Sequence, residues 1–444
     1  MAVVKPFRAV RYNPAKVGPL DKVIALPYDR IDEKLQETYY NLSPYNVVRM
    51  SLGKRFPDDN ETNNVYTRAR KYFDEWLKEG ILTRDPKPCF YAYTEEFTVP
   101  GTGDRLARRG VIGMIKLVPF DEGTILPHER TLSGPKVDRL NLLRAMEVHL
   151  GQIFILYPDP ENRINQLLDA HIQREPDIDA VAVGEADVRH KVWVIDDPKV
   201  LAAIQQEMAP KRNLIIADGH HRYETALAYR DEMRAKHPDW TEQHAFNYVM
   251  ATLVSMSDPG LVILPTHRLI HSYTRMSAGE ILEKARQYFD VQEMPSREAL
   301  EAKMRELANQ AHVIGFYDGK GYYLLTLRDL AAMDQVVKEP RAPEWKALDV
   351  SILHELILEH IMGLTKESIE RKENIDYLRD PGPGYAAVSA GEANFLFLLN
   401  PTKPQQVAAC AAKGEKMPQK STDFYPKVLT GLTFAPIRWE DKLE

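Results

Sequence analysis

The chain has 444 residues with 58 basic and 64 acidic side chains, and its formal net charge of −6 gives no overall electrostatic reason to expect a nucleic-acid partner. Hydrophobic residues make up 44% and charged residues 27%, which is close to the average for globular proteins and excludes a disordered or fibrous chain. The two cysteines, Cys89 and Cys410, lack ligand-like spacing, and no run of about 18 apolar residues occurs. We therefore expect a cytoplasmic protein without disulfides and without a membrane partner.

Helical and strand-like patterns alternate along the first 264 residues. Apolar residues recur at helical spacing from Val65 to Leu77, and Gly80 follows as a stop signal, so we predict a helix there. Alternating apolar residues predict an antiparallel hairpin formed by residues 90–97 and 111–118. Short apolar runs predict further strands at 152–157, 191–195, 213–217, 248–254 and 261–264, and helical periodicity predicts helices at 137–146 and 223–233.

The rest of the chain shows the same mixture of patterns. The periodicity predicts helices at 277–288, 296–309 and 348–362, and hairpins at 312–327 and 387–401. A polar stretch follows the last of these hairpins. The pattern as a whole indicates a mixed α and β protein.

The segment with the strongest chemistry is the turn from Asp218 to Arg222. A short apolar run at 213–217 stops at Asp218-Gly219, and a helical pattern starts almost at once with His220 and His221. Such a strand–turn–helix junction presents backbone N–H groups and the positive end of a helix dipole, and here two imidazoles and a guanidinium are added. An anionic group is the natural ligand, and Asp218 could hold Mg²⁺ or accept a proton. The alternative is that Asp218 only caps the helix.

Three further segments carry polar groups between predicted elements. Residues 127–136 lie between a strand and a helix, and their candidate substrate contacts are His128, Glu129, Arg130 and Lys136, with Glu129 also a candidate general base. Residues 417–427 contain lysines and hydroxyls of the kind that bind phosphate, namely Lys420, Ser421, Thr422 and Lys427. His267 and Arg268 follow the predicted strand at 261–264 and are also candidate substrate contacts. A solvated connector and a plain surface turn are the alternatives for the first two segments.

Standard nucleotide and hydrolase signatures are missing from the sequence. No Walker-type glycine–lysine loop and no Gly-x-Ser-x-Gly elbow occurs. The sequence therefore does not indicate a conventional nucleotide-loop kinase or a serine hydrolase.

Six separated segments together resemble a large prokaryotic family that was first catalogued as a domain of unknown function. They are residues 25–29, 41–46, 128–139, 218–222, 264–268 and 417–427, and the match runs from the N-terminus to about Leu432. The resemblance implies a relation to free serine kinases, whose core is similar to the ParB and sulfiredoxin folds and whose phosphates bind at a Gly-His-Arg-like turn. Asp218, Gly219, His220, His221 and Arg222 match that turn.

The resemblance further implies a pyrophosphate-dependent serine kinase, which makes O-phospho-L-serine from the small-molecule substrates L-serine and pyrophosphate with Mg²⁺. The catalytic acidic residue of the shorter, nucleotide-using kinases does not map clearly onto this sequence. Asp218 and Glu129 therefore remain competing candidates for the base. The alternatives are an ADP- or ATP-dependent free serine kinase, a ParB-like nucleotide-gated DNA-binding protein and a ligand sensor without turnover.

We predict an α+β fold with mixed sheets, a ParB/sulfiredoxin-like core and a second α/β lobe, with a cleft between the lobes. The predicted domains are a phosphate-binding catalytic lobe, 1–270, and a second lobe, 271–444, whose C-terminal segment returns to the active site.

Overall fold

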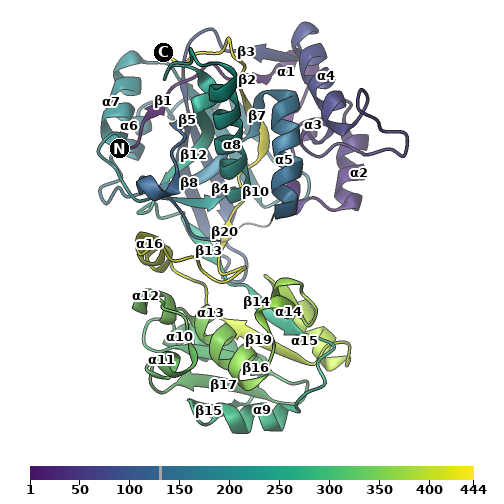
Figure 1. Cartoon of the computed structure of the whole chain (residues 1–444), viewed down its shortest axis with the longest axis vertical. Helices are drawn as coiled ribbons and strands as arrows, with labels where there is room; N and C mark the ends of the chain where they lie inside the picture. The colour runs from purple at the N-terminus through teal and green to yellow at the C-terminus, as the bar shows by residue number, and fades with distance from the viewer. Residues whose placement is uncertain (130–132) are drawn as a thin grey trace. The chain divides into compact units, whose positions relative to one another are not determined.

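A computed structural model describes residues 1–129 and 133–444, apart from the side chains of residues 133–135. The chain divides into two compact units, and each has its own sheet and its own helices (Figure 1). Unit 1 consists of Met1–Pro127, Thr131–Val262 and Pro426–Glu444, and unit 2 consists of His128–Arg130 and Ile263–Tyr425. The fold is mixed α/β, as the sequence predicts, whereas the ParB/sulfiredoxin-like core, the cleft and the division at residue 270 remain predictions.

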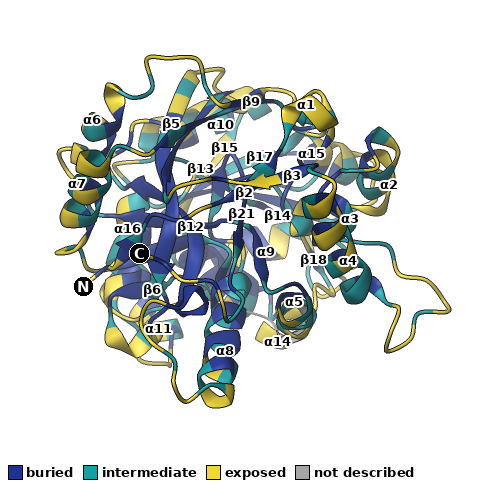
Figure 2. Ribbon diagram, turned by 90° about the horizontal axis from the view of Figure 1, so that it is seen from above, coloured by how far each residue is buried: buried dark blue, intermediate teal, exposed yellow. Residues whose placement is uncertain are grey.

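The larger sheet of unit 1 has nine strands within the described residues. In pairing order they are β6 (Ile125–Pro127), β11 (Leu214–Asp218), β8 (Ile153–Tyr157), β12 (Tyr248–Ser255), β5 (Arg105–Lys116), β4 (Phe90–Thr98), β10 (Val188–Ile195) and β9 (Ile178–Ala180), with β1 (Val4–Lys5) beside β5. β11 runs parallel to β6, β12 runs parallel to β8, and the other pairs are antiparallel. The sheet is therefore mixed. Every residue of β12 is buried, and Figure 2 shows this strand in dark blue.

A smaller sheet of unit 1 joins the two ends of the chain. Its strands, in pairing order, are β3 (Leu82–Arg84), β2 (Val10–Tyr12), β21 (Thr430–Pro436) and β7 (Val148–Gly151). Val10 lies opposite Phe434 in the register, and Phe434 packs edge-on against Phe73 in the hydrophobic core of this region. The C-terminal strand β21 is thus part of unit 1, and so are residues 426–429, which directly precede it.

Helices cover the sheets of unit 1, and their ends follow local sequence signals. They are α1 (Pro14–Val17), α2 (Glu33–Leu42), α3 (Val48–Ser51), α4 (Val65–Lys78), α5 (Ser133–Met146), α6 (Arg163–Asp169), α7 (Pro198–Met208) and α8 (His220–Lys236), with 3₁₀ turns at Leu20–Lys22, Tyr28–Arg30, Phe120–Glu122 and Ala245–Asn247. Asn64 caps α4 in a reciprocal capping box with Thr67. α5 and α8 lie side by side, and an ion pair of 2.6 Å joins Lys136 of α5 to Glu224 of α8 (Figure 1).

Unit 2 is built on an antiparallel sheet with six strands in the described residues. In pairing order they are β15 (Phe289–Met294), β17 (Tyr322–Leu327), β16 (Val313–Tyr317), β19 (Phe395–Leu399), β14 (His267–Ile270) and β18 (Ile375–Leu378), and β13 (Val262–Leu264) pairs separately with β20 (Asp423–Tyr425). The α-helices are α9 (Ala278–Ala285), α10 (Arg297–Leu307), α11 (Ala332–Val336), α12 (Pro343–Lys346), α13 (Asp349–Ser351), α14 (Lys366–Glu370), α15 (Gly382–Ser389) and α16 (Pro404–Ala412). A π-helix, η5 (Ile352–Ile361), continues α13.

Most of the predicted elements are confirmed, including the helix at 65–77 and the hairpins at 90–118 and 312–327. The predicted hairpin at 387–401 is wrong. α15 occupies its first residues, and β19 finds both of its partners, β14 and β16, far away in the sequence. The predicted helix at 348–362 exists, but most of it has π-helical hydrogen bonding. Across the described part of the chain, every helix is too short or too polar to span a bilayer.

Candidate active site

The turn between β11 and α8 requires glycine at position 219. Gly219 has φ of 92°, a left-handed conformation that strongly favours glycine. A Cβ atom there would also lie 2.5 Å from Cγ2 of Ile153, which is closer than two non-bonded carbon atoms can approach. Because Gly219 is the N-cap of α8, strand and helix meet without a spacer. The positive end of the α8 dipole therefore lies directly at the end of β11.

Asp218 ends β11 with an ionised carboxylate between two cations. Nη2 of Arg222 donates to Oδ2 at 3.3 Å, and Nζ of Lys427 donates to Oδ1 at 3.5 Å. Burial raises the pKa of Asp218, but the charges of Lys427, Arg222 and His220 outweigh it and lower the pKa to about 2. The capping alternative is wrong, because Gly219 is the N-cap and the carboxylate of Asp218 is bonded to side chains instead.

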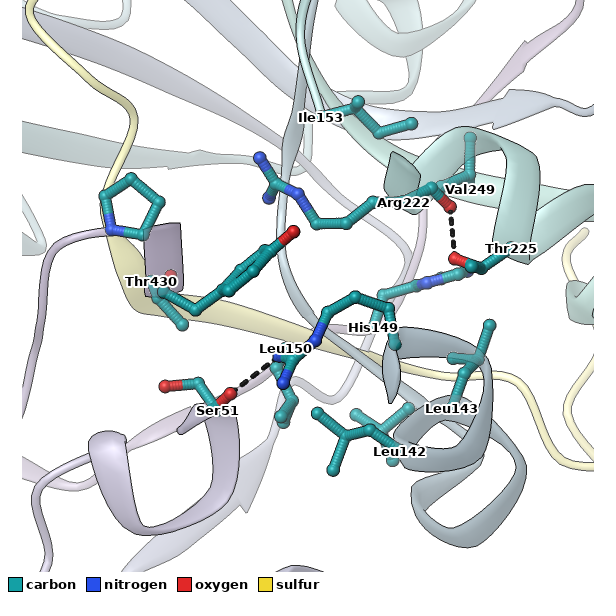
Figure 3. Close-up of a pocket in the computed structure, with 15 residues that line it drawn as sticks. Ser51, Leu142, Leu143, His149, Leu150, Ile153, Arg222, Thr225, Val249 and Thr430 are labelled. Carbon is teal, nitrogen blue, oxygen red and sulfur yellow. Dashed lines mark hydrogen bonds between the residues drawn. The ribbon is translucent and has the colours of Figure 1, made fainter. Parts of the chain in front are cut away.

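Arg222 also lines a small cavity of unit 1, about 80 Å³ in volume. Figure 3 shows its side chain reaching from α8 across this cavity, and its Nη1 donates to the carbonyl of Gln152 at 2.7 Å. The guanidinium of Arg139 lies 4.2 Å from the ring centre of Tyr28 in the same lining. The Oγ atom of Ser51 is buried there without a hydrogen-bond partner in the described part of the chain. The cavity thus combines two guanidinium groups with mostly apolar walls.

Sequence reasoning found Arg222 but missed the rest of this cavity. Tyr28 belongs to the segment 25–29, which carried the family resemblance but was assigned no role. Arg139 lies in the segment 128–139, and Ser51 had no signal in the sequence. Arg139, which ends the resemblance segment 128–139, was the signal in the sequence that could have led to this cavity.

A buried polar network fixes the chain on both sides of Lys427. Nη2 of Arg108 donates to the carbonyl of Pro426 at 2.6 Å, and the hydroxyl of Tyr93 accepts from the amide of Leu429. Arg108 is itself paired with the buried Glu95, whose carboxylate accepts from Nε at 2.7 Å. Burial raises the pKa of Glu95 to about 7 although Arg108 opposes this shift. Lys427, 8% exposed, is therefore held in place at Asp218 from both sides.

In unit 2, His128 and Glu129 of the predicted loop contact Met417 and Thr422 of the predicted segment at 417–427. The imidazole of His128 is buried, and its Nε2 lies 2.8 Å from Oγ1 of Thr422. The same hydroxyl donates to Oε1 of Glu129 at 3.3 Å, and the amide of Met417 donates to the carbonyl of His128 at 2.9 Å. The side chain of Glu129 is 27% exposed, so its carboxylate can still reach a ligand.

His267 and Arg268 lie in the interior of unit 2. Nδ1 of His267 accepts from the amide of Leu399 at 3.2 Å, and burial followed by the charge of Arg268 lowers the pKa of His267 to about 4. Arg268 is 1% exposed and donates to the carbonyls of Gln419 and Lys420, each at 3.1 Å. Both side chains therefore hold neighbouring main chain in place, and their role as substrate contacts stays a prediction.

Four of the predicted site residues remain: Arg130, Lys136, Lys420 and Ser421. Lys136 pairs with Glu224, as described above, and Arg130 lies outside the described residues. Lys420 is exposed with φ of 55°, whereas Ser421 is buried and donates to the carbonyl of Pro418. Unit 1 contains Lys136, Asp218, Gly219, His220, His221, Arg222 and Lys427, and unit 2 contains His128, Glu129, His267, Arg268, Lys420, Ser421 and Thr422.

The fit of Mg²⁺ to these residues rests on one carboxylate. Among the described residues, no group of three or more His, Cys, Asp or Glu side chains is arranged to hold a metal ion. In phosphoryl-transfer sites, however, Mg²⁺ keeps several waters and needs only one or two carboxylates together with substrate phosphates. Asp218 is ionised and its side chain is 23% exposed, so it fits that requirement.

Several solved structures are similar to this chain at low identity. A conserved hypothetical protein from Pyrococcus furiosus is 12% identical, with 75% of this chain and 96% of that one covered and a TM-score of 0.34. A free serine kinase in complex with AMP is 12% identical, with 74% and 92% covered and a TM-score of 0.35. SbnI from Staphylococcus aureus, with a C-terminal truncation, is 11% identical, with 73% and 87% covered and a TM-score of 0.35.

None of the curated proteins is a detectable relative of this chain. A family model described as a protein of unknown function, DUF1015, matches residues 4–351, which is most of the chain. This match confirms the family resemblance seen in the separated sequence segments. The chain belongs to the DUF1015 family.

Proposed function

We propose that this protein is a phosphotransferase that makes O-phospho-L-serine from free L-serine, with pyrophosphate as the phosphoryl donor. The observation that carries the proposal is the cluster at the start of α8, where Lys427 and Arg222 contact the ionised Asp218. Enzymes of this class work chiefly by positioning the donor and neutralising its oxygens. The serine acceptor follows from the family resemblance.

In this proposal the residues of the turn bind the donor. The positive end of α8 and the guanidinium of Arg222 neutralise phosphate oxygens, and the imidazoles of His220 and His221 add hydrogen bonds. Lys427 adds a second cation, which Asp218 holds at the turn. Mg²⁺, held by Asp218 and by donor oxygens, would supply further neutralisation of the phosphate charge.

The two candidate bases differ in their suitability. A carboxylate with a pKa of about 2 is a weak base at neutral pH, so Asp218 is suited to hold charge and not to accept the serine proton. Glu129 therefore remains the other candidate general base, as the sequence predicts. Its carboxylate is partly exposed and is held by the hydroxyl of Thr422. In the reaction, the serine hydroxyl oxygen bonds to a phosphorus atom of pyrophosphate, the serine proton passes to the general base, and the bridging P–O bond breaks, so that inorganic phosphate leaves.

The cavity beside Arg222 supports a small donor. Pockets that take drug-sized ligands have volumes of about 300–1,000 Å³, whereas this cavity has about 80 Å³. A phosphoryl group is closer to that size than a nucleoside is. One observation favours the alternative donors, ADP or ATP: the walls include apolar residues such as Leu142 and Leu143, which suit a base or ribose (Figure 3).

We also propose that the core around the Asp218 turn is ParB/sulfiredoxin-like and that nucleic acid is not a partner. The net charge of −6 supports the second point. DNA binding that weakens steeply with salt would instead favour the ParB-like alternative.

A donor screen tests the proposed function. Purified protein with Mg²⁺ and L-serine is incubated with pyrophosphate, ADP or ATP in turn, and O-phosphoserine is measured by mass spectrometry. We expect product with pyrophosphate and little with the nucleotides. Product with ADP or ATP alone would replace the donor assignment, and no product with any donor would refute the function.

A further inference from the structure

A second cavity lies wholly within unit 2, and the proposed function does not use it. Its volume is about 110 Å³, and its walls come from α12, η5, α14 and residues 416–419. Trp345, Ile369 and Met417 give it an apolar side, since all three are largely buried. Its polar side carries groups of both charges.

The ammonium group of Lys366 contacts two carboxylates of this cavity, and one of them is Glu339, whose Oε1 lies 3.5 Å from Nζ. Nζ of Lys366 lies 3.7 Å from Oε1 of Glu355, whose side chain is 12% exposed. Glu359, four residues further on, makes no side-chain hydrogen bond or ion pair within the described residues. Burial and then the charge of Glu355 raise the pKa of Glu359 to about 7. The carboxylates of the lining outnumber its cations by four to three: they are Glu339, Glu355, Glu359 and Glu370 against Arg341, Lys366 and Lys416.

A buried imidazole also lines the cavity. His354 is 6% exposed, and its Nε2 accepts from Nε of Arg268 at 3.2 Å. Because a guanidinium can only donate, Nε2 is the unprotonated nitrogen and the proton lies on Nδ1. Nδ1 has no acceptor in the described part of the chain. Burial and the charge of Arg268 lower the pKa of His354 well below its ordinary value, so this neutral form persists.

These groups match the two ends of a zwitterion. A cation alone would face Lys366 as well as the carboxylates, and an anion alone would face Glu355 and Glu359. A ligand that carries both charges can contact both kinds of group favourably: its ammonium contacts the glutamates, and its carboxylate contacts Lys366 and the N–H of His354. The volume is that of roughly four waters, at about 30 Å³ each, which suits a small molecule.

We propose that this cavity binds a small free α-amino acid, with its ammonium group on Glu355 and Glu359 and its carboxylate on Lys366 and Nδ1 of His354. Binding itself does not depend on the proposed function. Such an amino acid could be the acceptor substrate or an effector, because both offer the same chemistry. The experiment separates these two sources.

Isothermal titration calorimetry of the whole protein without any phosphoryl donor tests the proposal. The probes are glycine, L-alanine and L-serine, with ethanolamine and propionate as analogues that carry one charge each. We expect at least one amino acid to bind and both analogues to bind at least tenfold more weakly. Glu359→Gln and Lys366→Met should each weaken amino-acid binding at least tenfold. Glu373→Gln, an exposed glutamate of the same unit, should leave it unchanged.

The turnover assay then separates the two sources. If the cavity holds the acceptor, Glu359→Gln raises the KM for L-serine and leaves the KM for the donor unchanged. If it holds an effector, the variant loses amino-acid binding while both KM values stay the same. Equal binding by Glu359→Gln and wild type, equal binding of ethanolamine, or no binding of any amino acid would overturn the proposal. An inactive protein that still binds amino acids through Glu359 would refute the proposed function alone.

Discussion

Replacing Asp218 by Asn removes the negative charge between Lys427 and Arg222 and changes the volume of the side chain little. We expect kcat to fall by about 10²-fold or more, which is typical of losing an essential charged group. Because the pKa of Asp218 is about 2, the carboxylate stays ionised at all ordinary assay pH values. The loss should therefore be the same from about pH 5 to about pH 9, as kinetics across this range will measure.

Asp231→Asn is the matched control for Asp218→Asn. Asp231 lies on the same helix and pairs with Arg230, and its side chain is 63% exposed. This variant should keep the wild-type kcat. A near-wild-type kcat for Asp218→Asn together with a collapse for Glu129→Gln would leave Asp218 a structural residue.

Arg222→Ala should raise the KM for the phosphoryl donor at least tenfold. It removes a charge-assisted hydrogen bond to phosphate, which is worth about 1.5–3 kcal/mol, and about 1.4 kcal/mol corresponds to tenfold. Arg144→Ala is the control, because it removes an arginine from a surface pair with Glu232 of α8. Initial-rate kinetics should show the control within about twofold of wild type. Equal donor KM values for the two variants would count against the assigned turn.

At this scale the sequence identified the turn but not its surroundings. Asp218, Arg222 and Lys427 were all predicted, because a strand end, a glycine and clustered cations form a local signal, and two of these residues are close in sequence. A hydrogen bond joins Lys427, the last residue of the predicted segment at 417–427, to Asp218. The cavity residue Ser51 was missed because only the pairing of distant elements brings it beside Arg222.

At the scale of elements, Gly219→Ala should destabilise unit 1 more than an alanine at another left-handed glycine does. Gly80, in the same unit, has φ of 72°, and a Cβ there meets nothing within 4 Å. Gly80→Ala should cost about 1–2 kcal/mol from the backbone alone. Gly219→Ala should cost about 1–3 kcal/mol more, because its Cβ overlaps Ile153. Urea unfolding of both variants measures the difference, and equal losses would contradict the close contact.

Tyr93→Phe tests the network that holds Lys427. It removes the hydroxyl that accepts from the amide of Leu429 and that lies 2.6 Å from Nδ1 of His190. We expect the donor KM to rise several-fold at a temperature where the variant is fully folded. Tyr157→Phe is the control, because the hydroxyl of Tyr157 is buried without a hydrogen-bond partner in the described residues. A stability loss in Tyr93→Phe without a change in donor KM would reduce the network to a structural role.

Periodicity predicted most elements, but it could not find those that depend on distant partners. β1 and β2 have two and three residues, too few for a pattern, and they exist because β5 and β21 pair with them. The apolar run of β19 resembled half of a hairpin, although its partners are β14 and β16. The π-helix η5 has the same apolar content as an α-helix, so its hydrogen bonding left no sequence signal.

For the whole molecule, we expect stability to fall as the pH drops from about 6.5 to about 4. Burial lowers the pKa of His149 and His267 to about 4, that of His190 to about 3, and that of His354 well below its ordinary value. The unfolded chain takes up these protons below about pH 6.5, while the folded chain does not. The raised pKa values of Glu95 and Glu359, each about 7, act in the opposite direction as two groups against four, and the raised pKa of Asp258 adds to them.

Each proton that only the unfolded chain binds contributes about 1.4 kcal/mol per pH unit. The free energy of unfolding in urea should therefore be lower at about pH 4.5 than at about pH 6.5, by roughly 2 kcal/mol or more. An equal or higher value at the lower pH would mean that these histidines are protonated in the folded protein.

A time course by ³¹P NMR tests the central claim most directly. Protein, Mg²⁺, L-serine and pyrophosphate are mixed, and the signals of pyrophosphate, inorganic phosphate and O-phosphoserine are followed in one sample. We predict that O-phosphoserine and inorganic phosphate appear in equal amounts as pyrophosphate is consumed, and that Asp218→Asn slows all three changes together. Conversion of pyrophosphate to inorganic phosphate alone, or unchanged pyrophosphate with folded protein, would contradict the claim.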